Sequence, residues 1–325
     1  MIAEGPCFDE LSVGEVFDSA PGLTLTSGLA QAHRSIIGER LALPLDDGLS
    51  ASVTGASALA SPALVWDVAI GQSTAATHHV KANLFYRGLV FHRAPHLGDA
   101  LRSRTEVVAL RQNRMREGRW PTGLAALRIT TTDQNGRPVL DFWRCAMLPL
   151  RDPEARTGRA NDLDAVGAAA SNESLTKMAY GWDLEPLRGR GPGSAELTEG
   201  QVIEIGGGDV VSSAPELARL TLNIAEVHHD AAAGGGTRLV YGGHTIGLAL
   251  AQATRALPGM ATVTGWQGCD HLGPVFEGDT LRSTITVERI EPLRTGKLTH
   301  LRSRVTADAP EPRDVLDWRF TALMP

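Results

Sequence analysis

The stretch VLDFWRCAMLP at residues 139–149 returns, with small changes, as VLDWRFTALMP at residues 315–325, an offset of 176. Two further pairs of stretches repeat in the same order along the chain. GDALRS at 98 matches GDTLRS at 278, an offset of 180, and LSVGEVFD at 11 matches LTEGQVIE at 197, an offset of 186. Three ordered matches with slowly drifting offsets are typical of an internal duplication. The sequence therefore predicts two copies of one structural unit.

Each copy contains one helix-like run ahead of its strands. The runs are ASALASPALVWDVAI at 56–70 and GGHTIGLALAQATRAL at 242–257. In the second run, apolar side chains recur at helical spacing at Ile246, Leu250, Ala253 and Leu257. The two glycines that open this run suit a tight entry into a helix, and Pro258-Gly259 suits its end.

The stretches after each helix have the pattern of strands. DTLRSTITVERI, beginning at 279, places Leu281, Ser283, Ile285 and Val287 on one face and polar side chains on the other. LTHLRSRVTA and VLDWRFTALM follow as further strands, and Asn135-Gly136 marks a hairpin in the first copy. We therefore predict an α+β unit with a central helix wrapped by an antiparallel sheet. Two such units in tandem can cover each other's open edge and face.

The segment between the copies, residues 152–177, is rich in Ala, Gly, Asp and Asn and has no sustained apolar period. It is interpreted as a linker across the surface. The predicted domains are thus residues 1–151 and 178–325, joined by this linker.

Composition excludes several classes of protein. The 325 residues carry a net charge of −6, which argues against a nucleic-acid or anionic-membrane partner. No apolar run approaches the roughly 20 residues of a membrane helix, and the N-terminus lacks the apolar core of a secretory signal. Cys7, Cys145 and Cys269 lie far apart without a CxxC, so neither a disulfide framework nor a zinc site is indicated. We expect a cytoplasmic protein.

One short segment of the second copy carries candidate chemistry. TLNIAEVHHDAAAGG, residues 221–235, places Asn223 five residues before His228, and VYGGHTIGLAL follows at 240–250. This order resembles the MaoC-like, R-specific enoyl-CoA hydratase superfamily, in which an Asp precedes a His by five residues and a glycine opens the central helix. Together with LRQNR at 110–114, the segment looks most like the mesaconyl-CoA hydratase (β-methylmalyl-CoA dehydratase) branch, where Asn stands at the Asp position.

The resemblance implies a tandem, or double, hotdog fold and one active site in each chain. At an offset of 184, Glu39 corresponds to Asn223 and Pro44 to His228, so the first copy has no histidine there. The resemblance therefore implies that the first copy is degenerate and helps to form the pocket. The expected substrate is an enoyl-CoA thioester, with no cofactor beyond the CoA of the substrate itself, and the expected assembly is a homodimer.

Hydration of such a thioester needs a base, an acid and a donor to the thioester oxygen. We assign His228 as the base, because its ordinary pKa lies near neutrality, and Asn223 to orient the water or the imidazole. The backbone N–H of Gly243 is assigned as the oxyanion donor, and Asp230, Tyr241 and Gly242 are assigned to substrate binding. Because an amide cannot move a proton, the reaction must be completed by a carboxylate (Asp230 or Glu226) or by His228 acting in both steps through a water chain.

Other interpretations of these residues stay open. Asn223 suits a cap or turn, the pair His228-His229 suits one buried and one exposed side chain, and Gly242-Gly243 suits a plain helix entry. Adjacent histidines on a strand point to opposite faces, so no metal site is expected at His78-His79 either. Five arginines are candidates to bind the CoA phosphates, and each of them also suits an ordinary solvated position on the surface: Arg87, Arg93, Arg111, Arg114 and Arg116. The alternative functions are hydration of another acyl-CoA in lipid or polyketide metabolism, thioester hydrolysis and non-catalytic acyl-CoA binding.

Overall fold

A computed structural model describes residues 5–168, 170–190, 197–308 and 311–325. Its helices are η1 (Phe8–Glu10), α1 (Ser27–Ile37), α2 (Ala42–Leu45), α3 (Asp47–Thr54), α4 (Pro62–Gln72), η2 (Ser73–Thr77), α5 (Asn172–Lys177), η3 (Glu185–Leu187), α6 (Ala214–Leu220), η4 (Glu226–His228) and α7 (Gly242–Ala256). Its strands are β1 (Val16–Phe17), β2 (Leu23–Thr24), β3 (Ala82–Phe91), β4 (Ala100–Gln112), β5 (Thr122–Thr132), β6 (Pro138–Pro149), β7 (Val202–Glu204), β8 (Asp209–Val210), β9 (Thr262–His271), β10 (Thr280–Pro292), β11 (Lys297–Asp308) and β12 (Arg313–Met324).

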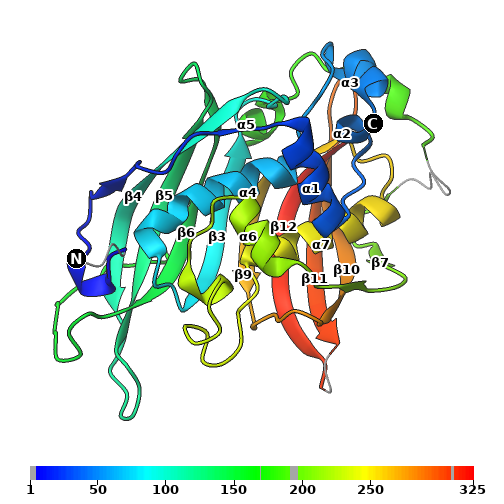
Figure 1. The fold of residues 1–325 in the computed structure, drawn as a ribbon. Coiled ribbons are helices and arrows are strands. Elements are labelled where there is room, and N and C mark those ends of the chain that lie inside the picture. The colour runs from blue at the N-terminus through cyan, green and yellow to red at the C-terminus, as the bar shows by residue number, and fades with distance from the viewer. Residues whose placement is uncertain (1–4, 169, 191–196, 309–310) are drawn as a thin grey trace.

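The strand order shows the duplication directly. One sheet runs β1-β4-β5-β6-β3-β9-β12-β11-β10-β7, so the order outward from the β3–β9 junction is the same on both sides. At that junction Tyr86 of the first copy pairs antiparallel with Cys269 of the second. Both copies therefore share a single sheet (Figure 1). The division at residues 152–177 stays a prediction, because this sheet is continuous from one copy to the other.

The two central helices lie together against one face of the sheet (Figure 1). The helix α4 begins at Pro62, later than the predicted run, because the side chain of Ser61 accepts a hydrogen bond from the backbone N–H of Ala63 and caps it. The helix α7 begins at Gly242, as predicted. Every residue of α4 is buried, which explains why its sequence shows no polar face.

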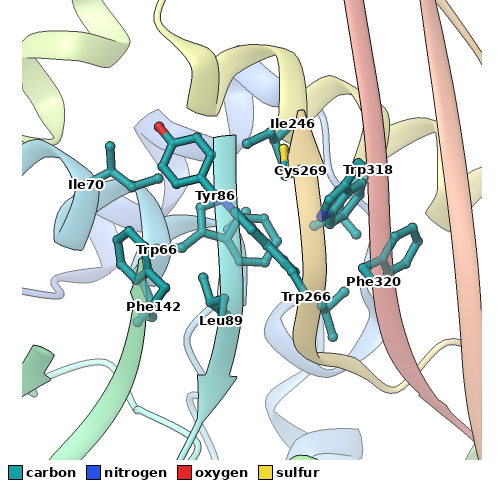
Figure 2. Packing of buried hydrophobic residues seen from close by; sticks show 14 of the residues in the cluster. Trp66, Ile70, Tyr86, Leu89, Phe142, Ile246, Trp266, Cys269, Trp318 and Phe320 are labelled. Atoms are coloured by element: carbon teal, nitrogen blue, oxygen red, sulfur yellow. The ribbon is translucent and has the colours of Figure 1, made fainter. Parts of the chain in front are cut away.

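Aromatic side chains join the two copies into one core (Figure 2). The ring of Trp66 on α4 lies 4.9 Å from that of Trp266 on β9 and 6.1 Å from that of Trp318 on β12. Trp318 in turn stacks on Phe320 at 3.9 Å. Because a helix of the first copy packs on strands of the second, the copies stabilise each other.

The predicted alternation in β10 is confirmed. Leu281, Ile285 and Val287 are fully buried, and Ser283 is 4% exposed. In the part of the chain that the structure describes, no helix is long and apolar enough to cross a membrane.

Candidate active site

A cavity of about 330 Å³ opens between η4, the first turn of α7, the start of β3 and the end of β9. Four of the residues singled out in the sequence line it: Asn223, His228, Tyr241 and Gly242. Gly243 and Asp230 are not among its lining residues. The copies thus contribute jointly, since β3 belongs to the first and the other three elements to the second.

Asn223 is held on α4 by a close backbone contact. A Cβ atom on Gly71 would lie 1.8 Å from the carbonyl oxygen of Thr221, so only glycine lets this segment approach the helix. The Oδ1 atom of Asn223 accepts a hydrogen bond of 3.0 Å from the backbone N–H of Ala225, which is an Asx turn. This contact directs Oδ1 to the backbone, and no described residue accepts a hydrogen bond from Nδ2. The amide nitrogen is therefore the polar atom of Asn223 that remains for a ligand.

His228 is fixed in one tautomer by a backbone carbonyl. Its Nδ1 lies 2.8 Å from the carbonyl oxygen of Leu239, which only accepts, so Nδ1 carries the proton and Nε2 keeps a lone pair. Burial lowers the pKa of His228 to about 4, and the charges of His229 and Arg144 act in the same direction. At neutral pH the imidazole is therefore uncharged, with Nε2 as an acceptor.

The first turn of α7 separates the roles of its two glycines. A Cβ atom on Gly243 would lie 2.1 Å from Oδ1 of Asp67 and 2.5 Å from Cζ of Tyr241, so Gly243 packs against α4. Gly242 lines the cavity, and its backbone N–H, as the first of the helix, has no acceptor within the helix. Placement at the cavity thus favours Gly242 over Gly243 as the oxyanion donor.

Tyr241 lines the cavity, and its hydroxyl contacts a buried carboxyl of the core. That hydroxyl lies 3.1 Å from Oδ1 of Asp67, a buried carboxyl whose Oδ2 lies 2.8 Å from Nε2 of His33. Burial raises the pKa of both Asp67 and Tyr241. The ring of Tyr241 is 5.8 Å from that of His228. This buried network anchors the start of α7 beside the imidazole.

The carboxylates near His228 in sequence face a different hollow. Asp230 and Glu226 line a neighbouring cavity of about 690 Å³, which shares only Thr74 and Asn223 with the first. Asp230 was expected to bind substrate or to move the second proton, but the segment turns away from the cavity through η4, and Oδ1 of Asp230 accepts a hydrogen bond from the backbone N–H of Ala232. Among the described residues that line the first cavity, none carries a carboxylate.

Our reason for excluding a metal at His78-His79 was wrong. These residues lie in a turn after η2, not in a strand, so their rings converge. The Nδ1 atoms of His79 and His78 lie 2.8 and 3.4 Å from Oε1 of Glu226. Within the described ranges this is the one group of side chains with the residue types and spacing to hold a divalent metal. A hydrogen bond from His79 to Glu226 accounts for the same geometry.

Several polar cavity residues were missed in the sequence, among them Tyr86, Arg144 and His271. His271 ends β9, and burial lowers its pKa to about 4. Tyr86 and Arg144 are directly opposite each other on β3 and β6. Arg144 lies in the repeated stretch at residues 139–149, and its counterpart in the second copy is Phe320. A position-by-position comparison of the two copies would have singled out this charged residue.

None of the five arginines suggested for the CoA phosphates lines the first cavity. Arg93 forms ion pairs with Asp99 and Asp133 at 2.9 and 3.2 Å. Arg114 and Arg116 instead border a third hollow of about 510 Å³ on the first copy.

Two solved structures match almost the whole chain. One is the conserved hypothetical protein Rv0216 from Mycobacterium tuberculosis, described as a double hotdog fold, with 54% identity, a TM-score of 0.91 and 99% of each chain covered. The other is a putative MaoC domain protein dehydratase from Chloroflexus aurantiacus, with 25% identity and a TM-score of 0.86 over 99% of this chain and 97% of that one. The chain belongs to the MaoC-like double hotdog dehydratase family. The fold predicted from the repeat is thereby confirmed.

Two curated proteins are also similar to this family member. The β-methylmalyl-CoA dehydratase of Chloroflexus aurantiacus is 28% identical over 99% of this chain and 97% of its own length. The mesaconyl-CoA hydratase of Cereibacter sphaeroides is 26% identical over 86% of this chain and 82% of its own. No family model matches the chain.

Proposed function

We propose that the protein is a hydro-lyase that adds or removes water across the α,β double bond of an enoyl-CoA thioester with a branched or dicarboxylic acyl group, such as mesaconyl-CoA or β-methylmalyl-CoA. The observation that carries the proposal is the neutral His228, whose Nε2 lone pair is left for the cavity beside the open N-terminus of α7. The names of the two curated relatives support the same reaction and the same acyl class.

The N-terminus of α7 supplies the oxyanion donor in this proposal. The thioester oxygen accepts a hydrogen bond from the backbone N–H of Gly242, where the helix dipole also favours negative charge. As water adds to the β-carbon, enolate charge develops on that oxygen and the hydrogen bond strengthens. One donor of this kind typically contributes about 3–4 kcal/mol to transition-state stabilisation.

His228 performs both proton transfers. Its Nε2 takes a proton from water while the water oxygen bonds to the β-carbon, and Asn223 Nδ2 donates a hydrogen bond to that oxygen. Because burial lowers the pKa of His228, the resulting imidazolium is a stronger acid than an ordinary protonated histidine and returns the same proton to the α-carbon. One water is thereby added as a hydroxyl and a hydrogen, with no net proton released. We assign both transfers to this one group because no carboxylate is among the described residues that line the cavity.

The proposal is tested with a panel of CoA thioesters that includes mesaconyl-CoA, crotonyl-CoA and 3-hydroxyacyl-CoA compounds. Loss of enoyl absorbance with a mass gain of one water is the expected result, and another preferred acyl chain would assign a different hydratase. Release of free thiol without that change would instead show thioester hydrolysis. CoA binding without turnover of any member of the panel would show a non-catalytic binding protein, and either of these results rejects the proposal.

A further inference from the structure

Arg144 is a buried cation without a carboxylate partner. Its side chain lies on β6, lines the cavity, and is 3% exposed. Its Nη2 donates to the carbonyl oxygen of Ser73 at 3.2 Å and to Oγ1 of Thr77 at 2.6 Å, both uncharged acceptors. Its Nε is buried with no hydrogen-bond partner among the described residues, and none of the ion pairs they form involves this guanidinium. A buried charge left in this state is unfavourable unless an anion joins it.

The fold itself does not require a charge at this position. In the second copy the corresponding residue is Phe320, which is 1% exposed and stacks on Trp318. Phe320 pairs with Trp266 across the strands, just as Arg144 pairs with Tyr86. The same position in the same sheet is thus filled by an aromatic pair in one copy and by a Tyr–Arg pair in the other. The polar pair is present in the copy whose strand β3 forms a wall of the cavity (Figure 2 shows Tyr86 on that strand).

The cavity as a whole is positive. Lys81 and Arg144 are among the described residues that line it, and no Asp or Glu is. The charge of Arg144 also contributes to lowering the pKa of His228, so the two groups act on each other through the cavity. Because Arg144 is fully buried while the phosphates of CoA are large and strongly hydrated, a carboxylate on the acyl group fits the guanidinium better than a phosphate.

We propose that Arg144 binds a carboxylate at the far end of the acyl group, so that the site selects thioesters of dicarboxylic acids. This inference rests on the proposed hydratase function and identifies the residue that recognises the carboxylate of the substrate. Arg144 acts by binding and takes no part in proton transfer.

The test compares two substrates that differ only in the distal group. Mesaconyl-CoA carries a carboxylate where tiglyl-CoA carries a methyl group. For Arg144→Met, kcat/KM for mesaconyl-CoA should fall by about 100- to 1000-fold, as expected when one partner of a buried charge pair is truncated. The value for tiglyl-CoA should stay within about fivefold of wild type. Arg128→Met, which removes a half-exposed arginine from the neighbouring strand β5, should change neither value.

Other roles of Arg144 predict different outcomes. If Arg144 only supports η2 through Ser73 and Thr77, the variant should melt at a lower temperature and lose both substrates equally. Equal loss of both substrates with unchanged stability would place the guanidinium on a CoA phosphate. Either result overturns the proposal, whereas removal of an uncompensated buried charge should leave the melting temperature of the ligand-free protein unchanged or higher.

Failure of the hydratase function is separable from failure of this inference. If the wild-type protein turns over no member of the panel, the proposed reaction is wrong, and the role of Arg144 is tested by calorimetry with succinyl-CoA and butyryl-CoA. Wild type should prefer succinyl-CoA by at least about tenfold and Arg144→Met should lose that preference. Equal affinity of wild type for both compounds would overturn the inference.

Discussion

His244, in the first turn of α7, provides a quantitative test of the buried interior beside the site. Its side chain is fully buried, and neither ring nitrogen has a hydrogen-bond partner among the described residues. Burial lowers its pKa to about 4, and the charge of His33 adds to this effect. In the unfolded chain a histidine has a pKa near 6.5. The folded protein therefore holds His244 neutral under conditions where the unfolded chain binds a proton.

The sign and size of the effect follow from proton linkage. A histidine with a depressed folded pKa leaves stability intact above about pH 6.5 and lowers it as the pH falls toward the folded value, because only the unfolded state gains the proton. With a folded pKa of about 4, the loss at about pH 5 relative to about pH 7.5 is about 2 kcal/mol for this one residue. The variant His244→Leu lacks this loss.

Urea unfolding of wild type and His244→Leu at both pH values measures the difference. Between about pH 7.5 and about pH 5, the free energy of unfolding of wild type should fall by about 2 kcal/mol more than that of the variant. Any difference in stability that the two proteins already have at the higher pH does not affect this comparison. Leu250→Ala, an uncharged core substitution on the same helix, should show an offset that does not change with pH. If the difference in unfolding free energy between His244→Leu and wild type is also independent of pH, burial does not hold the histidine neutral, and this prediction is wrong.

Two further predictions concern the start of α7 and the protonation of His228. In a thermal melt, Gly243→Ala should lower the melting temperature by several degrees, because its Cβ would lie 2.1 Å from Oδ1 of Asp67. The control Gly268→Ala, which has no atom within 4 Å of its added Cβ, should leave the melting temperature close to that of wild type. The pH profile of kcat/KM should lose activity as the pH falls through about 4, because His228 must be neutral to accept a proton; an acid limb centred near pH 7 would contradict its environment.

The internal repeat predicted most of the fold. Each copy carries one helix-like run followed by strands with alternating apolar side chains. These local patterns predicted the tandem arrangement, the start of α7 at Gly242 and the buried face of β10. The start of α4 was placed too early because an Ala-rich run has high helix propensity, while Ser61-Pro62 actually begins the helix.

The site was predictable only in part, because its residues meet through tertiary contacts. His228 and Asn223 were singled out because their spacing matches the motif of the family that the chain resembles. Arg144 and His271 reach the cavity through the pairing of β3 with β6 and β9, which periodicity does not specify. The choice between Gly242 and Gly243 depends on how α7 is rotated against Asp67 of α4. Consecutive residues of a helix point in directions about 100° apart, so adjacent glycines face different surroundings.

The central claim is that His228 moves both protons, and His228→Ala tests it most directly. The measurement is the initial rate of mesaconyl-CoA hydration by folded His228→Ala, beside wild type and His96→Ala, a histidine outside the cavity. The account predicts a loss of at least about 100-fold for His228→Ala, the lower end of the usual general acid–base contribution, and none for His96→Ala. Hydration by His228→Ala within a few-fold of wild type would contradict it.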